Sequence, residues 1–221
     1  MKRLFYLTLA VAAIFTGCSE PQKRVVALHT TMGDIRIELS NLTPQHRDNF
    51  VRLAEEGYFD SLLFHRVIEN FMIQGGDPDS RHAEAGEFLG NGGPDYIIPA
   101  EFRFPELFHQ RGALAAAREG DDINPEMASS GSQFYIVWGR TFTDEQLDQV
   151  QERIGNRVVY TPEIRETYKT LGGTPHLDGA YTVFGQVIEG LEVVEAIQKV
   201  ATDQNNRPTE DVRILQAVVE K

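Results

Sequence analysis

Residues 64–77 read Phe-His-Arg-Val-Ile-Glu-Asn-Phe-Met-Ile-Gln-Gly-Gly-Asp, and this stretch decides the fold. Arg66, two large apolar residues and Gln74 lie within nine positions, and a Gly-Gly-Asp turn closes the run. The segment that leads into the run is typical of a β-strand, in which alternate side chains point to opposite faces. That alternation predicts Leu62, Phe64 and Arg66 on one face, with the arginine set into an apolar wall.

The arginine in this stretch has two interpretations. A guanidinium is always charged and carries a rigid fork of N–H donors, so beside an apolar pocket Arg66 can direct a hydrogen bond at one atom of a bound ligand. Taken alone, however, Arg66 is better explained as an arginine that extends along the surface at the end of a strand and keeps its charge in water. The motifs elsewhere in the chain favour the first interpretation.

Four ordered segments resemble the cyclophilins, which are peptidyl-prolyl cis-trans isomerases. After 64–77 come Gly-Ala-Leu-Ala-Ala-Ala-Arg at 112–118, Ser-Gly-Ser-Gln-Phe-Tyr-Ile at 130–136 and Leu-Asp-Gly-Ala-Tyr-Thr-Val-Phe-Gly-Gln-Val at 177–187. The resemblance extends from about residue 25 to residue 219, apart from one insertion. It implies a mainly β fold, namely a closed eight-stranded antiparallel β-barrel capped by two helices.

The resemblance also implies roles for individual residues. Arg66 matches the catalytic position, from which it would donate a hydrogen bond to the proline nitrogen as the X-Pro bond twists. Gln74 matches the residue that fixes the substrate carbonyl. The residues that match the proline pocket are Phe71, Met72, Tyr135 and Leu177. The residues that match the peptide groove and the edge of the pocket are Ala117, Arg118, Gln133 and Tyr181.

Three positions depart from the family pattern. Tyr181 stands where a histidine is often found beside the pocket, and Arg118 replaces a common asparagine in the groove; both are compatible with peptide binding. His176 occupies the position that carries tryptophan in the cyclosporin-sensitive members. Tight cyclosporin binding is therefore not expected, because the indole donor and its stacking surface are gone.

The first residues have the layout of a bacterial export signal. Two basic residues precede an apolar run over 4–15, which is too short for a comfortable membrane span of about 20 residues. Residues 15–18, Phe-Thr-Gly-Cys, resemble a lipobox, in which signal cleavage leaves an acylated cysteine. We therefore expect a signal peptide over 1–17 and a tether over 18–24 that is lipidated at its first residue, Cys18. The alternative is an ordinary secretory signal followed by a stray cysteine.

The charge and composition of the chain limit the classes of partner that it is expected to bind. Two of the 21 basic residues lie in the predicted signal, so the mature chain has 19 basic and 33 acidic residues, a formal net charge of −14. Such a charge argues against nucleic acid as a partner. The six histidines show no close metal-ligand spacing, and we expect neither a metal nor a cofactor. The expected partners are proline-containing peptides, unfolded client proteins and, through Cys18, a membrane. The expected state is a monomer that is lipid-anchored in the bacterial cell envelope, on the periplasmic side or at the outer membrane.

Residues 25–221 are predicted to form one domain. A helix is expected after Thr43, with Pro44 at its first position, and another at about 191–199. The expected strands, read from alternation and turn signals, are 25–30, 35–39, 62–67, 71–75, 97–102, 112–117, 132–138, 181–188 and 211–219.

Residues 139–173 are predicted to form a helical insertion. Thr143 and Gln146 have the spacing of a capping box that opens one helix, and Thr161 and Pro162 open a second. The apolar residues at helical spacing are Leu147, Val150 and Ile154 in the first helix and Ile164, Tyr168 and Leu171 in the second. We expect this hairpin to lie beside the pocket and to tune the choice of substrate without supplying a catalytic residue.

Two classes of function remain after the sequence has been read. The first is a prolyl isomerase that assists protein folding in the envelope, with Arg66 stabilising the twisted amide. The second is a proline-peptide-binding module or holdase with little turnover. Loss of Arg66 separates them, because a binder could tolerate it and a catalyst could not.

Overall fold

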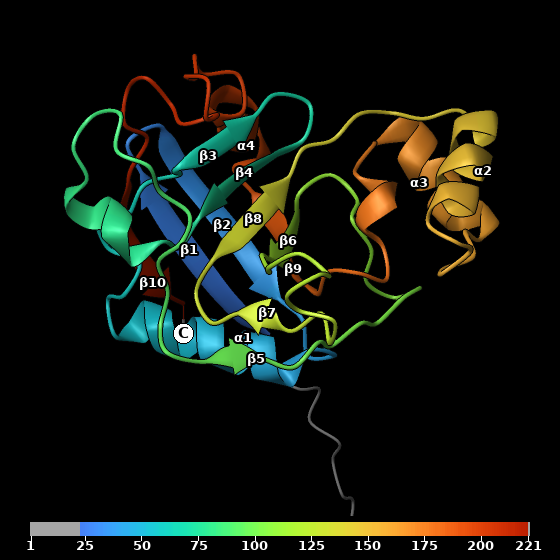
Figure 1. Cartoon of the computed structure of the whole chain (residues 1–221), viewed down its shortest axis with the longest axis horizontal. Helices are drawn as coiled ribbons and strands as arrows, with labels where there is room; N and C mark the ends of the chain where they lie inside the picture. The colour runs from blue at the N-terminus through green and yellow to red at the C-terminus, as the bar shows by residue number, and fades with distance from the viewer. Residues whose placement is uncertain (1–22, 221) are drawn as a thin grey trace, which may run out of the picture.

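The computed structural model describes residues 23–220, so the predicted signal peptide and Cys18 lie outside the described residues. The central element is an eight-stranded antiparallel sheet in the order β10-β1-β2-β9-β6-β8-β4-β3 (Figure 1). Its strands are β1 (Arg24–Thr30), β2 (Gly33–Leu39), β3 (Arg66–Ile68), β4 (Met72–Gly75), β6 (Ala113–Ala116), β8 (Phe134–Val137), β9 (Val183–Glu189) and β10 (Ile214–Val219). A separate two-stranded sheet pairs β5 (Ile97–Ile98) with β7 (Ser129–Ser130), so the strand expected over 97–102 is only two residues long.

The prediction of a closed barrel is wrong. The sheet curls into a half-barrel whose end strands, β10 and β3, do not pair with each other. The segment before β3 makes only an isolated bridge across this gap, between Leu63 and Arg213. β3 is three residues long and begins beyond that bridge, so no continuous ladder closes the sheet.

The prediction that Leu62, Phe64 and Arg66 share one face is also wrong. Leu62 and Phe64 are fully buried in the inner core, whereas Arg66 lines a pocket on the other side of the sheet. The cause is that regular strand begins only at Arg66, so the two-residue alternation does not extend back to Phe64. Inside β3 the alternation does hold, because Val67 belongs to the inner core.

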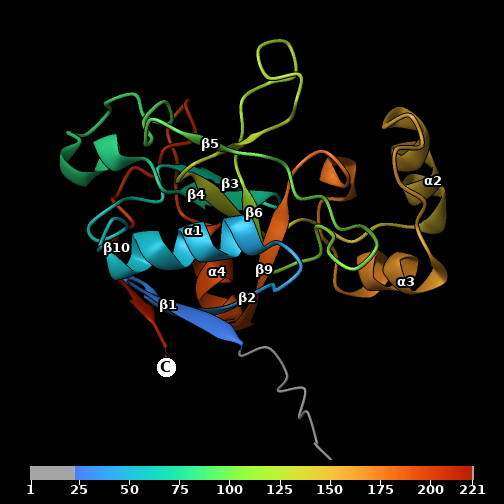
Figure 2. The same cartoon turned by 90° about the horizontal axis from the view of Figure 1, so that it is seen from below.

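The two faces of the sheet carry different clusters. On β8, Phe134 and Ile136 join the inner core, while Tyr135 and Val137 join an outer cluster below the pocket. Helices α1 (Pro44–Glu55) and α4 (Leu191–Ile197) bury their apolar residues in the inner core, as expected for the two capping helices. Figure 2 shows α1 lying across the strands, in agreement with its contacts to β1, β9 and β10.

Helix α1 begins where expected, but its cap differs. Thr43 occupies the N-cap position, yet its hydroxyl makes no capping hydrogen bond. The carboxylate of Glu101, far away in the sequence, instead accepts the backbone N–H groups of Gln45 and His46. These groups would otherwise be unpaired at the start of a helix, so a long-range contact replaces the local cap.

The insertion forms the predicted helical hairpin, with helices α2 (Asp144–Arg153) and α3 (Pro162–Thr170). The capping box between Thr143 and Gln146 is present. Both helices stand to one side of the curled sheet (Figures 1 and 2). They share a small core of their own, although Leu171, expected on its buried face, is exposed.

The insertion leaves the sheet and returns to it at nearly the same point. Arg140, at its start, forms an isolated bridge with Gly173, at its end. Gly139 has φ +66°, and a Cβ at that position would lie 2.1 Å from the carbonyl oxygen of Gly173. Only glycine permits so close a crossing, and this fixes the base of the hairpin beside the 3₁₀ turn Pro175–Leu177.

Candidate active site

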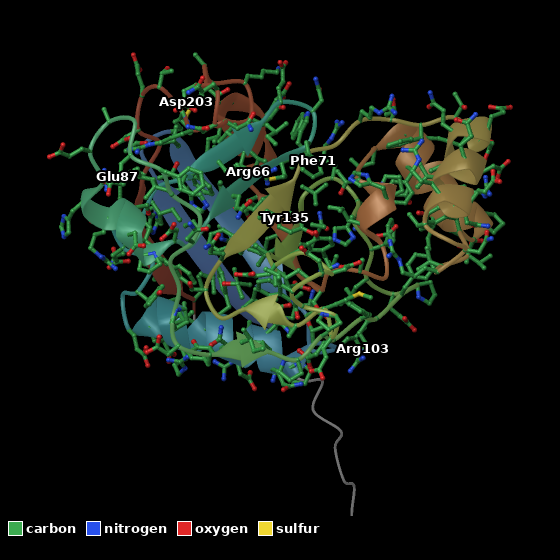
Figure 3. The ribbon with its side chains drawn as sticks, in the orientation of Figure 1. Arg66, Phe71, Glu87, Arg103, Tyr135 and Asp203 are labelled. Atoms are coloured by element: carbon green, nitrogen blue, oxygen red, sulfur yellow. The ribbon has the colours of Figure 1, made fainter. Side chains whose placement is uncertain are left out.

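Strand register places the key polar side chains in one row on the outer face of the sheet. Arg66 on β3 pairs with Gln74 on β4, Gln74 pairs with Tyr135 on β8, and Tyr135 pairs with Ala115 on β6. Figure 3 shows Arg66 and Tyr135 on the same side of the sheet, with Phe71 toward the insertion. Residues from three separate motifs thus meet because neighbouring strands align them.

This row lies in a hollow of about 420 Å³. Nine of the ten predicted catalytic and substrate-binding residues line it, and the tenth, Gln133, lies just behind. The lining residues that were predicted are Arg66, Phe71, Met72, Gln74, Ala117, Arg118, Tyr135, Leu177 and Tyr181. The structure therefore brings together the residues that the sequence motifs single out.

A chain of amides orients the polar side of the pocket. Arg66 Nη1 donates to Gln74 Oε1 at 3.0 Å, and Gln74 Nε2 donates to Gln133 Oε1 at 3.0 Å. Gln133 Nε2 in turn donates to the carbonyl oxygens of Gly90 and Gly92, at 2.9 and 2.8 Å. Gln133 therefore supports Gln74 from behind the groove wall.

Arg66 keeps free donors in a partly dehydrated site. Its side chain is half-buried, and this burial lowers the pKa of Arg66 from its ordinary value. It remains a cation at neutral pH, because a guanidinium loses its proton only under strongly basic conditions. Within residues 23–220 its guanidinium makes no hydrogen bond other than the one to Gln74, so its other N–H groups are available to a ligand.

The apolar side of the pocket is suited to a compact ring. Met72 and Tyr135 are buried beneath the surface, and Phe71, Leu177 and Tyr181 pack on the same outer cluster. The His176 ring stacks on Phe71, with centroids 5.7 Å apart and planes inclined by 26°. A proline ring would meet aromatic and aliphatic walls here, within reach of the charged row.

Arg118 packs against Tyr181 in the wall of the pocket. Its guanidinium carbon lies 4.4 Å from the centroid of the Tyr181 ring, and its Nε donates to the carbonyl oxygen of Ala180 at 2.7 Å. Its Nη1 forms an ion pair with Asp121 at 2.7 Å and donates to the carbonyl oxygen of Glu119 at 2.8 Å, and the side chain is only 3 % exposed. Its charge is already engaged, so its contribution is to hold Tyr181 against the pocket.

A buried polar chain behind the pocket was not predicted. The Tyr135 hydroxyl and His109 Nε2 lie 2.9 Å apart, and His109 Nδ1 lies 2.8 Å from Asp178 Oδ1. The Tyr168 hydroxyl, on α3, donates to Asp178 Oδ2 at 2.6 Å. Burial, then the charge of Asp178, raises the pKa of the Tyr168 hydroxyl well above its usual value. The insertion is thus connected to the wall of the proline pocket through buried side chains.

One end of the hollow was also missed. It is formed by the loop 87–91 together with His65, Asn205 and Arg207. His65 is 3 % exposed, and neither ring nitrogen has a hydrogen-bond partner among the described residues. Burial lowers the pKa of His65 to about 4, so the ring is neutral. Its place next to Arg66 in the motif was the one sequence signal for this end.

A second buried cluster has the pattern of a hydrolase triad but no opening. His46 Nε2 lies 2.9 Å from the Ser129 hydroxyl, and His46 Nδ1 lies 2.7 Å from Glu101 Oε2. All three side chains are buried, and none lines the hollow. Because Glu101 also holds the start of α1, this cluster ties the helix to the loops around the small β5–β7 sheet.

Comparison with known proteins now identifies the family. Residues 25–219 match the model of the "Cyclophilin type peptidyl-prolyl cis-trans isomerase/CLD" family. This chain is a cyclophilin-type peptidyl-prolyl cis-trans isomerase. The match spans both capping helices, the insertion and all of the sheet except the first residue of β1.

Similar proteins agree with this assignment. A candidate peptidyl-prolyl cis-trans isomerase from Staphylococcus haemolyticus is 37 % identical over 193 residues, which cover 86 % of this chain and 87 % of the relative. One from Staphylococcus epidermidis is 36 % identical over 197 residues and 89 % of this chain. A Cryptosporidium parvum cyclophilin-type isomerase superposes with a TM-score of 0.66 at 25 % identity, over 90 % of this chain and 99 % of that one. The crystal structure of that isomerase in the presence of the dipeptide Ala-Pro gives a TM-score of 0.65.

Two further features of this cyclophilin can be stated for residues 23–220. None of the helices there combines the length and apolar character needed to cross a bilayer. In the same residues no group of three or more histidine, cysteine or acidic side chains is placed to hold a metal ion.

Proposed function

We propose that this cyclophilin catalyses prolyl isomerisation through Arg66, on proline-containing segments of proteins that fold in the bacterial envelope. The observation that carries the proposal is a half-buried guanidinium with free N–H donors beside an apolar pocket. The crystal structure of the Cryptosporidium parvum isomerase in the presence of the dipeptide Ala-Pro supports a proline-containing ligand. In this proposal the apolar pocket holds the proline ring, and Arg66 donates a hydrogen bond to the proline nitrogen.

The barrier to rotation sets what the site must supply. Partial double-bond character makes rotation of an X-Pro amide cost about 18–20 kcal/mol. As the bond twists, the proline nitrogen regains a lone pair that can accept a hydrogen bond. A donor from Arg66 would bind this twisted state more strongly than either planar state, and only such differential binding raises the rate. The pocket formed by Phe71, Met72 and Tyr135 would hold the ring while the rest of the peptide turns.

Gln74 has a positioning role in this proposal. Its Oε1 accepts from Arg66, and its Nε2 faces Gln133, so both ends of the amide are fixed. A fixed Gln74 holds the guanidinium at one angle before a substrate arrives. Such preorganisation avoids reorganisation at the moment of rotation.

Location in the envelope rests on the N-terminal sequence. The proposed anchor is an acylated Cys18, after cleavage of residues 1–17. Several acyl chains on one residue would retain the protein at a membrane, because each buried methylene contributes about 0.8 kcal/mol. The tether would then keep the pocket near proteins that are emerging into the same compartment.

The decisive experiment compares Arg66→Ala and Arg66→Lys with the unmodified protein. Loss of one transition-state donor typically lowers turnover by about 100- to 1,000-fold. Arg66→Lys keeps the charge but loses the planar fork, so it separates charge from a directed donor. Isomerisation of a short X-Pro peptide is followed by a protease-coupled assay, and binding of the same peptide by calorimetry. Undiminished turnover in folded Arg66→Ala would exclude the mechanism; peptide binding without turnover in the unmodified protein would instead establish the holdase.

A further inference from the structure

A second hollow adjoins the proline pocket on the side of the insertion. It has a volume of about 350 Å³ and lies between the first helix of the insertion and the edge of the pocket. It shares Phe71 with the proline pocket, and His176, which stacks on Phe71, forms part of its wall. The two hollows therefore have Phe71 as a common wall.

The charge of this second hollow is opposite to that of the chain. Its lining contains Arg140 and Arg153 and no acidic residue. Both guanidinium groups lack an ion-pair partner in the part of the chain that the structure describes, although Arg140 lies over the Phe142 ring at 4.8 Å. Unpaired arginines facing one cavity are notable in a chain whose formal net charge is −12.

The ion pairs inside the hairpin lie on the side of α2 that faces α3. On the side where α2 meets α3, Asp144 and Asp148 form ion pairs with Arg165, and Asp144 also pairs with Lys169. Two of the four acidic residues of α2 are therefore engaged with α3. The other two, Glu145 and Glu152, do not line the hollow, so no carboxylate shares its wall with Arg140 and Arg153.

Two further observations indicate that the hollow is polar enough to hold a ligand. The Thr174 hydroxyl in its wall is buried and has no hydrogen-bond partner among the described residues. The positive field also reaches the edge of the pocket. Burial and the charge of His109 lower the pKa of His176, Asp178 opposes this shift, and Arg153 and Arg140 lower the pKa further.

We propose that this hollow, which we call the acidic-residue subsite, binds the carboxylate of an aspartate or glutamate that lies near the proline in the substrate. The subsite residues are Arg140, Arg153, Thr174 and His176. An extended chain advances about 3.3 Å per residue, so an acidic residue within about three positions of the proline can reach it. The inference rests on the proposed isomerase function and names a class of substrate that the insertion selects.

The experiment uses the full chain purified in detergent and a series of peptides. Each peptide contains one proline and a single Glu, Gln or Lys, placed one to three positions before or after it. Isomerisation is measured by exchange NMR, which needs no protease and therefore no fixed cleavage residue. In at least one position we expect Glu to raise kcat/KM about three- to tenfold over Gln, through a lower KM, as for a pair of partly exposed ion pairs. A Lys in that position should lower kcat/KM below the value for the Gln peptide.

Two variants separate the subsite from the overall charge. Arg140→Gln/Arg153→Gln should remove the advantage of Glu while leaving kcat/KM for the Gln peptide within about twofold. Arg52→Gln/Lys199→Gln removes the same charge from exposed ion pairs on α1 and just beyond α4, so it should keep the advantage. Equal rates for Glu, Gln and Lys peptides at every position would overturn the inference alone. An advantage that survives Arg140→Gln/Arg153→Gln would overturn it as well. Absence of isomerisation for all peptides would instead overturn the proposed isomerase function.

Discussion

Replacement of Tyr168 by phenylalanine tests how firmly the insertion is joined to the pocket wall. The change removes only the hydroxyl that donates to Asp178 Oδ2 at 2.6 Å, in a side chain that is fully buried. A hydrogen bond to a charged group contributes about 1.5–3 kcal/mol, and a buried carboxylate oxygen left without a partner adds to the loss. We therefore expect Tyr168→Phe to lower the free energy of unfolding by about 2–3 kcal/mol.

The same cluster offers a matched control. Tyr160 is also buried, and its hydroxyl donates to the backbone carbonyl of Pro175 at 2.7 Å. Since this acceptor is neutral, Tyr160→Phe should cost only about 1 kcal/mol. The two variants lose the same atom from the same small core and differ in the charge of the acceptor.

The assay is urea unfolding followed by circular dichroism, together with thermal melts. For a chain of this size each kcal/mol shifts Tm by about 2–4 °C, so Tyr168→Phe should melt about 5–10 °C lower and Tyr160→Phe about 2–4 °C lower. If Tyr168→Phe costs no more than Tyr160→Phe, the carboxylate of Asp178 does not depend on the insertion, and the inferred connection to Tyr135 is wrong.

Three further predictions follow from other parts of the chain. Cys18→Ala should abolish acylation and move the protein from the membrane fraction to the soluble fraction; an unmodified Cys18 in membranes, found by mass spectrometry, would contradict the anchor. Burial holds the pKa of His65 at about 4 against 6.5 in the unfolded chain, so the unfolded chain binds the proton first and stability falls as pH drops through this window. The free energy of unfolding of His65→Gln should therefore fall less between pH 7 and pH 4.5 than that of the unmodified protein, by roughly 2–3 kcal/mol. Urea unfolding at both pH values measures this difference. His176→Trp should restore a stacking surface on Phe71 and strengthen cyclosporin binding about three- to tenfold by calorimetry; an unchanged affinity would show that another part of the pocket limits it.

The pocket residues could be predicted because their motifs resemble those of the cyclophilins, and four of them, Arg66, Met72, Gln74 and Tyr135, lie on regular strands. In β4 and β8 the alternation of inner and outer side chains holds at every position, so Met72 and Tyr135 fall on the pocket face while Ile73 and Phe134 fall on the core face. The family motifs identify which of these outer side chains meet.

The same alternation failed where the chain is irregular. The segment before Arg66 hydrogen-bonds to the far edge of the sheet, with Phe64 N–H donating to Val212 O at 2.9 Å. That long-range contact holds Phe64 in the core. The barrel stays open because regular strand begins only at Arg66, beyond the isolated bridge at Leu63. Neither result can be read from a window of a few residues, since the partner lies about 150 residues away in the sequence.

The insertion shows the limit of treating a segment as a separate unit. Its caps, its two helices and, apart from Leu171, its apolar stripes were correctly predicted, and they describe a hairpin that could dock on the barrel without affecting it. Tyr168 was read from spacing as an apolar contact, and its ring does pack in the small core. Its hydroxyl, however, supplies one hydrogen bond of a buried carboxylate whose other oxygen holds His109 behind Tyr135. Excision of residues 139–173 would therefore remove a polar partner of the pocket wall together with the proposed acidic-residue subsite. Point substitutions separate the two roles. Tyr168→Phe tests whether the insertion supports the pocket wall, and Arg140→Gln/Arg153→Gln tests whether it selects the substrate.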